Sequence, residues 1–196
     1  MNSIKEINGG KIIKGMIFCE FLEMVEGSFG LAVMDEMVES SDLPSGGIYT
    51  AVGTYDHQEL ITMVIRLSQI TETPLPELLL AYGQNLFSKL MDSLPGLLQD
   101  NQDCFEFIKN IDSHIHVEVE KLYPEAELPS LSFDIIDDDN MVLHYQSCRP
   151  FATVAHGLLL GCSVYYDNGF SVNVVNSDQA SDNEISFRLT RTVAVV

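Results

Sequence analysis

Apolar residues in the first half of the chain recur every three or four positions, which is the spacing of one helix face. Phe18, Phe21, Leu22, Val25 and Phe29 form the first such stripe, and Gly30 is expected to end its helix. Further helices are predicted over residues 32–39, over residues 56–69 with a capping box from Asp56 to Glu59, and from Pro74 through Leu90. The intervening segments 41–54 and 93–102 are expected to be loops.

The second half of the chain contains the two-residue alternation of β-strands. Residues 130–136 and 141–147 are predicted to form a hairpin around a turn at Asp137 to Asn140. A helix over residues 151–166 and strands over 169–175 and 184–195 follow. The aspartates of the turn lack the later ligands and the glycine of an EF-hand loop, so we expect a solvated turn and no calcium site. Helices followed by antiparallel strands predict an α+β fold, in which a helical subdomain precedes a helix-packed antiparallel sheet.

A helix predicted over residues 108–124 carries two histidines, His114 and His116. Its apolar stripe consists of Ile108, Ile111, Ile115, Val119 and Leu122. At about 100° per residue, the two histidines lie on opposite sides of this stripe, so periodicity alone does not choose between them. Their neighbours differ. His116 shares its flank with Ile108, Asp112, Val119 and Tyr123, whereas His114 shares its flank with Asn110, Glu118 and Lys121. We therefore expect His116 to be the more buried histidine, as a metal ligand requires.

Three polar residues share one face of the strand-like run that ends at Arg149. Alternation places Tyr145, Ser147 and Arg149 on the same side. A guanidinium group binds a carboxylate with two parallel hydrogen bonds, and two hydroxyls can each add one more. The pattern is therefore suited to binding carboxylates, although an arginine paired with one of the chain's own acids would give the same pattern.

Composition excludes several classes of function. The net charge of −19 argues against nucleic acid as a partner, because phosphates would be repelled. The four cysteines (Cys19, Cys104, Cys148 and Cys162) are widely spaced and lack a Cys-x-x-Cys pattern. This spacing argues against a zinc site, a disulfide framework and covalently attached heme. No apolar run reaches the roughly 18 residues of a membrane span, and the N-terminus lacks a signal-peptide core, so a cytoplasmic protein is expected.

Several motifs in order along the chain resemble the heme-nitric oxide/oxygen binding (H-NOX) family, which is related to the sensory domain of soluble guanylate cyclase. They are Lys14 to Phe18, Ala81 to Gly83, His116 with Leu122 to Pro124 downstream, Pro129, Tyr145-x-Ser147-x-Arg149, and Gly157 to Gly161. The resemblance implies one heme-enclosing domain over residues 14–196, with residues 1–13 as an N-terminal extension. It also implies that His116, and not His114, is the proximal iron ligand of noncovalent heme b. Tyr145, Ser147 and Arg149 would bind the propionates, and Pro129 would press on and distort the heme.

The other heme face is expected to select the gas. In oxygen-binding members of the family a tyrosine lies five residues after the arginine of this motif, and here that position is Val154. Without a hydroxyl donor, bound oxygen would lose a hydrogen bond of about 1.5–3 kcal/mol, whereas nitric oxide needs far less of that help. By position, the resemblance also assigns Ile17, Phe21, Leu86 and Leu158 to an apolar distal pocket. Tyr82 is the one alternative donor, but we expect it to pack in the core.

The resemblance thus implies a nitric oxide sensor that also binds CO and has no catalytic residues. NO would weaken the bond from iron to His116 and so switch a separately encoded partner, either a histidine kinase or a cyclic-di-GMP enzyme. Three alternatives stay open at this point. The first is an oxygen-binding H-NOX protein that uses Tyr82, and the second is a heme-free interaction module. The third is a mononuclear iron enzyme, which would need two histidines and a carboxylate around one metal.

Overall fold

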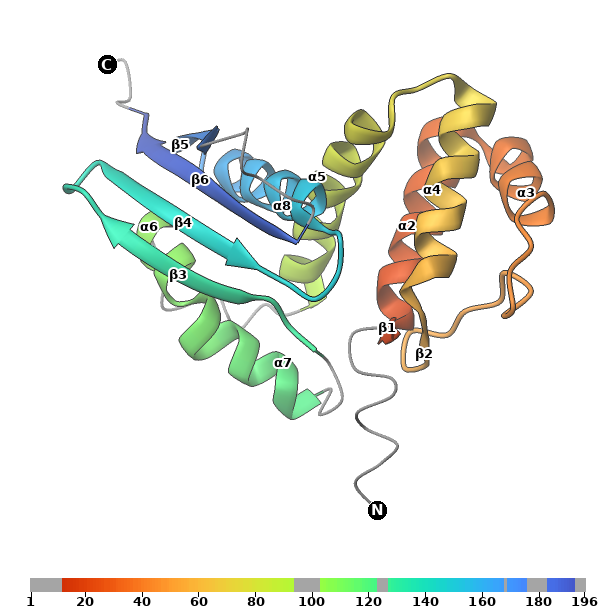
Figure 1. The fold of residues 1–196 in the computed structure, drawn as a ribbon, viewed down its shortest axis with the longest axis horizontal. Coiled ribbons are helices and arrows are strands. Elements are labelled where there is room, and N and C mark those ends of the chain that lie inside the picture. Colours follow the sequence, from red (N-terminus) through yellow and green to blue (C-terminus); the bar gives the residue numbers. More distant parts are fainter. Residues whose placement is uncertain (1–11, 94–102, 123–126, 168, 176–182, 193–196) are drawn as a thin grey trace. The chain divides into compact units, whose positions relative to one another are not determined.

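The chain divides into two compact units, Met1–Tyr82 and Gly83–Val196. The structure, a computed structural model, describes residues 12–93, 103–122, 127–167, 169–175 and 183–192 (Figure 1). Helix α5 (Leu75–Ser93) contributes residues to both units. The expected loop at residues 93–102 lies almost wholly outside the described residues, as does most of the segment 1–13.

The first unit is helical, as the sequence pattern predicts. It contains α2 (Gly15–Phe29), α3 (Leu31–Glu39), α4 (His57–Thr71) and the first turns of α5. Phe18, Phe21 and Val25 are fully buried, so the predicted stripe is the face that α2 turns to the core. Gly30 ends α2 with a φ of 87°, a backbone conformation that residues other than glycine rarely adopt.

Two features of this unit differ from the prediction. Short strands β1 (Ile12–Lys14) and β2 (Thr54–Asp56) form an antiparallel pair. Segments of three residues are too short for alternation in the sequence to predict them. The capping box of α4 is also only half formed. Asp56 accepts a hydrogen bond from the Gln58 N–H at 2.9 Å, but the carboxylate of Glu59 is turned away. It is buried and accepts hydrogen bonds from Ser45 and Tyr49, so it anchors the preceding loop.

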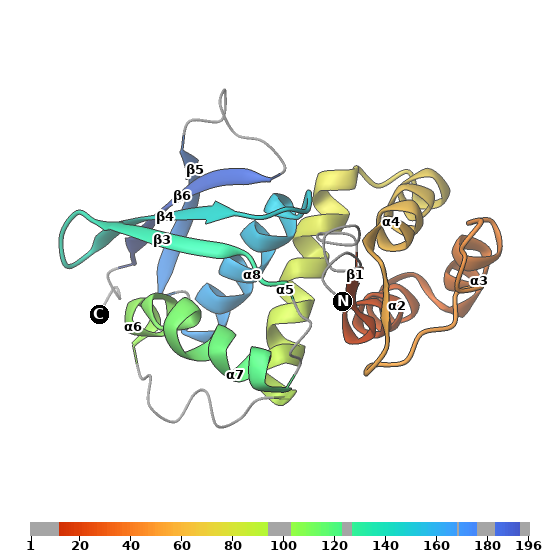
Figure 2. The same cartoon turned by 60° about the horizontal axis from the view of Figure 1, so that its bottom comes forward.

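The second unit is a four-stranded antiparallel sheet in the order β3-β4-β6-β5. Its strands are β3 (Ser130–Ile135), β4 (Asn140–Gln146), β5 (Phe170–Val175) and β6 (Glu184–Arg191). The hairpin of β3 and β4 pairs Ser130 with Gln146 and Ile135 with Met141. Helices α6 (Cys104–Lys109), α7 (His116–Leu122) and α8 (Ala152–Tyr165) lie along one side of the sheet (Figure 2). The predicted α+β architecture is confirmed.

One face of the sheet forms the core of this unit. Met141, Leu143 and Tyr145 alternate along β4 and are buried, together with Phe187 and Leu189 of β6. They belong to one apolar cluster with residues of α6, α8 and the second part of α5.

Glycines allow α5 and α8 to approach closely within the second unit. A Cβ atom on Gly83 would lie 2.3 Å from the carbonyl oxygen of Val154, and one on Gly161 would lie 2.8 Å from Cβ of Phe87. The glycines of two motifs quoted above therefore serve helix packing.

Candidate functional site

The segment that carries the two histidines is not one α-helix. Asp103 caps α6 by accepting hydrogen bonds from the N–H groups of Phe105 and Glu106, at 2.9 and 3.0 Å. After α6, residues Ile111–Ile115 form a π-helical turn, in which Ile115 donates to the carbonyl oxygen of Asn110 five positions earlier. Helix α7 then begins at His116. The uniform rotation of 100° per residue used for the predicted helix is therefore wrong across this turn, although Ile108 and Ile115 are buried as expected.

The two histidines differ in exposure as predicted. The side chain of His116 is 15% exposed, and its Nδ1 lies 3.1 Å from Oδ1 of Asp112. His114 is exposed, and its Nδ1 lies 2.8 Å from the hydroxyl of Ser113. Within the described part of the chain, Nε2 of His116 makes no hydrogen bond. Of the two histidines, His116 is therefore the one whose ring is largely buried and whose Nε2 is not used in a hydrogen bond among the described residues.

His116 lines a cavity of about 280 Å³ together with Pro129. The cavity lies between the histidine segment and the residues that lead into β3, and its other lining residues are Asp112, Val117, Glu120, Leu128 and Ser130. The sequence predicted roles for His116 and Pro129 at one site, and the structure brings them to one cavity.

Tyr145, Ser147 and Arg149 are also close together, but not on one strand face. Strand β4 ends at Gln146, so the prediction of a strand through Arg149 is wrong. Pro150 has no N–H to donate, so the hydrogen-bonded ladder could not continue through it. The hydroxyl of Ser147 accepts from the Arg149 N–H at 3.2 Å. Burial raises the pKa of Tyr145, and the nearby Ser147 hydroxyl and Arg149 charge oppose that rise.

Arg149 is buried and contacts Glu127. Its side chain is 5% exposed, with Nη1 donating to the Glu127 carbonyl oxygen at 2.7 Å and Nη2 to the Glu127 carboxylate at 3.0 Å. The pairing of this arginine with an acid of the chain, which the sequence left open, is therefore present in the structure. It also shows that the guanidinium group is placed to bind a carboxylate.

The expected distal residues are divided between the two units. In the second unit, Leu86 and Val154 are 4% and 6% exposed, and Leu158 packs partly buried against the core. In the first unit, Phe21 is fully buried and Ile17 is half-buried.

Tyr82 is packed in the core of the first unit, as predicted. It is 1% exposed, and its ring packs edge-on against Phe21 with 5.3 Å between ring centroids. Its hydroxyl donates to the carbonyl oxygen of Ile17 at 2.6 Å. Burial raises the pKa of Tyr82 well above its usual value, so the hydroxyl stays protonated. Its proton is already engaged by the backbone.

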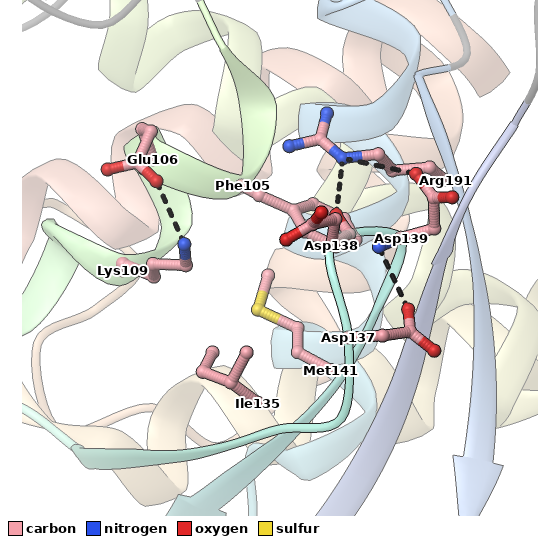
Figure 3. Close-up of a pocket in the computed structure, with 9 residues that line it drawn as sticks. All are labelled: Phe105, Glu106, Lys109, Ile135, Asp137, Asp138, Asp139, Met141 and Arg191. Carbon is pink, nitrogen blue, oxygen red and sulfur yellow. Dashed lines mark hydrogen bonds and ion pairs between the residues drawn. The ribbon is translucent and has the colours of Figure 1, made fainter.

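A second cavity, of about 330 Å³, lies at the tip of the β3–β4 hairpin beside α6 (Figure 3). Lys109 pairs with Glu106 at 2.8 Å on one side of it, and Arg191 donates to the carbonyl oxygen of Asp138 at 3.0 Å on the other. Asp137 accepts hydrogen bonds from the Asn140 side chain and from the Asp139 N–H, and these lower the pKa of Asp137. These contacts are those of the turn that the sequence predicted.

Arg191 also joins the end of β6 to the start of α6. Its Nη1 and Nη2 donate to the two carboxylate oxygens of Asp103 at 2.7 and 2.9 Å, and its guanidinium group lies 4.3 Å from the Phe105 ring centroid. The same carboxylate therefore caps α6 and ties it to the sheet.

Ser186, His144 and Asp134 form a hydrogen-bonded row across the outer face of the sheet. His144 Nδ1 lies 2.8 Å from the Ser186 hydroxyl, and its Nε2 lies 3.0 Å from the Asp134 carboxylate. Asp134 is 76% exposed, and none of the three residues lines either cavity described above. The row therefore shares its residue types with a catalytic triad but lies outside both of those cavities.

Within the described residues, no group of three or more His, Cys, Asp and Glu side chains is placed to hold a metal ion. A mononuclear site of two histidines and a carboxylate therefore has no candidate in this part of the chain. Among the same residues, no helix is long and apolar enough to cross a membrane.

Two site residues were not assigned a role from the sequence. Asp112 stands four positions before His116, a spacing that could have indicated contact. Glu127 lies 22 positions before Arg149 in a connecting segment, and no local pattern indicates that pairing.

Comparison with known proteins places this arrangement in a family. A family model described as Haem-NO-binding matches residues 14–174. An H-NOX structure from K. algicida, in the unliganded Fe(II) state, has 34% sequence identity and a TM-score of 0.84, covering 94% of this chain and 99% of that one. The Fe(II)CO solution structure of the Shewanella woodyi H-NOX protein, bound to IWP-051, has 42% identity and a TM-score of 0.80, with coverage of 94% and 97%.

A third structure, from S. oneidensis in the Fe(II)NO state, has 25% identity and a TM-score of 0.82, covering 92% of this chain and 100% of that one. The comparison with curated proteins found no match. The family model and the two more similar structures agree with the motifs described above, and the chain therefore belongs to the H-NOX family of heme-binding gas sensors.

Proposed function

We propose that this chain is a nitric oxide sensor that holds noncovalent heme b through His116. The observation that carries the proposal is the state of that imidazole. Its Nδ1 is engaged by Asp112, its Nε2 is uncommitted within the described residues, and it lines a cavity with Pro129. A single neutral imidazole with one free nitrogen is what a heme iron requires from the protein on its proximal side.

The polar residues of the second unit support the same assignment. A porphyrin with two propionates needs donors for buried carboxylates, and Arg149 with Tyr145 and Ser147 supplies them. Arg149 already binds the Glu127 carboxylate, so a propionate would displace or share that contact. The donor set therefore suits a heme.

Selectivity for NO over oxygen is proposed from two residues. Val154 has no hydroxyl at the position where oxygen-binding relatives carry one. Tyr82, the alternative donor, gives its proton to the Ile17 carbonyl oxygen. An apolar pocket without a donor disfavours bound oxygen, whose partial negative charge needs a hydrogen bond, and leaves NO and CO as the expected ligands.

When bound, the heme supplies the iron that takes up the gas. His116 would hold the iron, and Pro129, which lines the same cavity, would press on the macrocycle. Because α7 begins at His116, a gas that loosened this histidine from the iron would free α7 to move with it. NO acts as a switch only because it favours one of two states of the protein. A separately encoded histidine kinase or cyclic-di-GMP enzyme is the proposed reader of that change.

The test is the absorption spectrum of the ferrous protein alone and with NO, CO or air. NO and CO should each shift the Soret band, and air should not produce a stable ferrous oxygen spectrum. Changing His116 to Gly should remove the proximal ligand, while the matched change His114→Gly should leave the band nearly unmoved. A stable oxygen spectrum would overturn the NO-selective proposal, and a reversed pattern in the two glycine variants would overturn the ligand assignment.

A heme-free interaction module is the second candidate, and in it Glu127 would be the lasting partner of the buried Arg149 guanidinium. Expression with added heme precursor distinguishes the two. A protein that stays colourless would establish the heme-free function, and a Soret band that depends on His116 would exclude it.

A further inference from the structure

Asp112 and His116 are linked by a hydrogen bond between their side chains and not by the backbone hydrogen bond of an α-helix. Asp112 lies in the π-helical turn, and His116 is the first residue of α7. The backbone N–H of His116 donates to the carbonyl oxygen of Ile111, one position earlier than an α-helix would use. The carbonyl oxygen of Asp112 is therefore not the partner of His116, whereas its carboxylate lies 3.1 Å from Nδ1.

The carboxylate acts on the imidazole without competition from a basic residue. Within the described ranges, Asp112 forms no ion pair with a lysine or an arginine. The Asp112 side chain is 49% exposed, while that of His116 is 15% exposed. The carboxylate therefore lies on the solvent side of a largely buried imidazole. An ionised carboxylate only accepts hydrogen bonds, so Nδ1 carries the proton and Nε2 carries the lone pair.

This arrangement has a known effect on a metal ligand. A carboxylate that accepts from the far nitrogen of a ligating histidine fixes the ring orientation and tautomer, and it increases the electron donation of the near nitrogen. A stronger donor favours ferric over ferrous iron and strengthens the bond that NO must weaken.

We propose that Asp112 is a positioning residue that orients Nε2 of His116 toward a heme iron and strengthens the bond between them, so that it sets how readily NO releases His116. This proposal deepens the proposed function and rests on His116 being the iron ligand. Asp112 would act only through Nδ1 of His116, without touching the iron or the gas.

The chain offers a matched control. Glu120 lines the same cavity as Asp112 and carries the same charge, but among the described residues its carboxylate forms no hydrogen bond or ion pair with the His116 ring. Asp112→Asn and Glu120→Gln each remove one negative charge beside the cavity with almost no change in shape. Only the first alters the hydrogen bond to Nδ1.

The readouts are the iron–histidine stretching frequency of the ferrous protein by resonance Raman spectroscopy and the heme reduction potential. Asp112→Asn should lower the frequency and raise the potential, and it should weaken His116 as a ligand by roughly 10- to 100-fold. Asp112→Glu, which keeps the charge, should recover much of the wild-type frequency. Glu120→Gln should leave both readouts near the wild-type values.

The outcomes separate this inference from the proposed function. An unchanged frequency and potential in Asp112→Asn, in a protein whose His116 is shown to bind iron, would overturn the role of Asp112 alone. Equal shifts in Asp112→Asn and Glu120→Gln would also overturn it, because they would indicate a general charge effect. A wild-type protein with no iron–histidine band would overturn both proposals.

Discussion

The hydroxyl of Tyr82 donates its proton to the backbone carbonyl oxygen of Ile17 at 2.6 Å, inside a core where Tyr82 is 1% exposed. This contact decides what Tyr82 can do. A hydroxyl that has given its proton to a carbonyl has no proton left for a ligand. Tyr82 is therefore a structural residue of the first unit.

Replacing Tyr82 with Phe should change stability and leave gas selectivity alone. Loss of one buried hydrogen bond is expected to lower the free energy of unfolding by about 1 kcal/mol, which urea denaturation would measure. The absorption spectrum of the ferrous variant in air should match that of the wild type. A variant that lost an oxygen spectrum present in the wild type would show that Tyr82 does reach the ligand.

Introducing a hydroxyl at position 154 should favour oxygen. Val154→Tyr is expected to raise oxygen affinity by roughly 10- to 100-fold, because a hydrogen bond to a charged acceptor contributes about 1.5–3 kcal/mol. Val154→Phe is the control, since it adds the same ring without the hydroxyl. Oxygen titration of the two ferrous variants would measure the difference, and equal affinities would mean that position 154 does not face the ligand.

The close contact at Gly83 predicts a large effect of a small substitution. A Cβ atom there would lie 2.3 Å from the Val154 carbonyl oxygen and 2.7 Å from Cα of Gly157, and backbone cannot yield as a side-chain end can. Gly83→Ala should therefore destabilise the protein by about 1–3 kcal/mol.

Gly27 provides the opposite case. It lies in α2, and a Cβ atom there would meet nothing within 4 Å. Gly27→Ala should stabilise the protein by about 0.5–1 kcal/mol, because alanine loses less conformational freedom in a helix. Thermal unfolding of both variants gives the comparison, and a stabilised Gly83→Ala protein would contradict the packing described here.

The pair of Asp103 and Arg191 predicts a pH dependence. Hydrogen bonds from Arg191 outweigh the effect of burial and lower the pKa of Asp103 from 3.8 to about 2. Because the folded pKa is the lower one, the stabilisation is fully present above about pH 4 and is lost as the pH falls toward 2. Urea midpoints measured between pH 5 and pH 2 should fall less steeply in Asp103→Asn than in the wild type.

The two roles of Asp103 can be separated at neutral pH. Asparagine caps a helix as well as aspartate does, so Asp103→Asn loses only the charge that pairs with Arg191. Asp103→Ala loses the cap as well and should be less stable than Asp103→Asn by about 1 kcal/mol. If the two variants unfold at the same urea concentration, the carboxylate does not cap α6 in solution.

Local patterns in the sequence predicted most of the fold and which of the two histidines is less exposed. Apolar spacing predicted α2 and its end at Gly30, and the flank of His116 predicted its lower exposure. The features that were missed depend on contacts or geometry without a local signal. A π-helical turn has no distinctive apolar period, and the Glu127–Arg149 contact joins residues 22 positions apart. The Glu59 carboxylate does not complete the expected capping box, because it accepts hydrogen bonds from Ser45 and Tyr49 of the preceding loop instead.

Because of the π-helical turn at Ile111–Ile115, the position of His116 also depends on the number of residues in the segment that precedes it. Deleting one residue from the turn would let the α-helical ladder run unbroken from α6 into α7, and every later residue would rotate by about 100° relative to α6. His116 would then leave the cavity that it shares with Pro129, with no change in its own identity. The number of residues between Asp103 and His116 therefore decides where His116 lies, and an insertion or deletion there should move the imidazole out of the cavity.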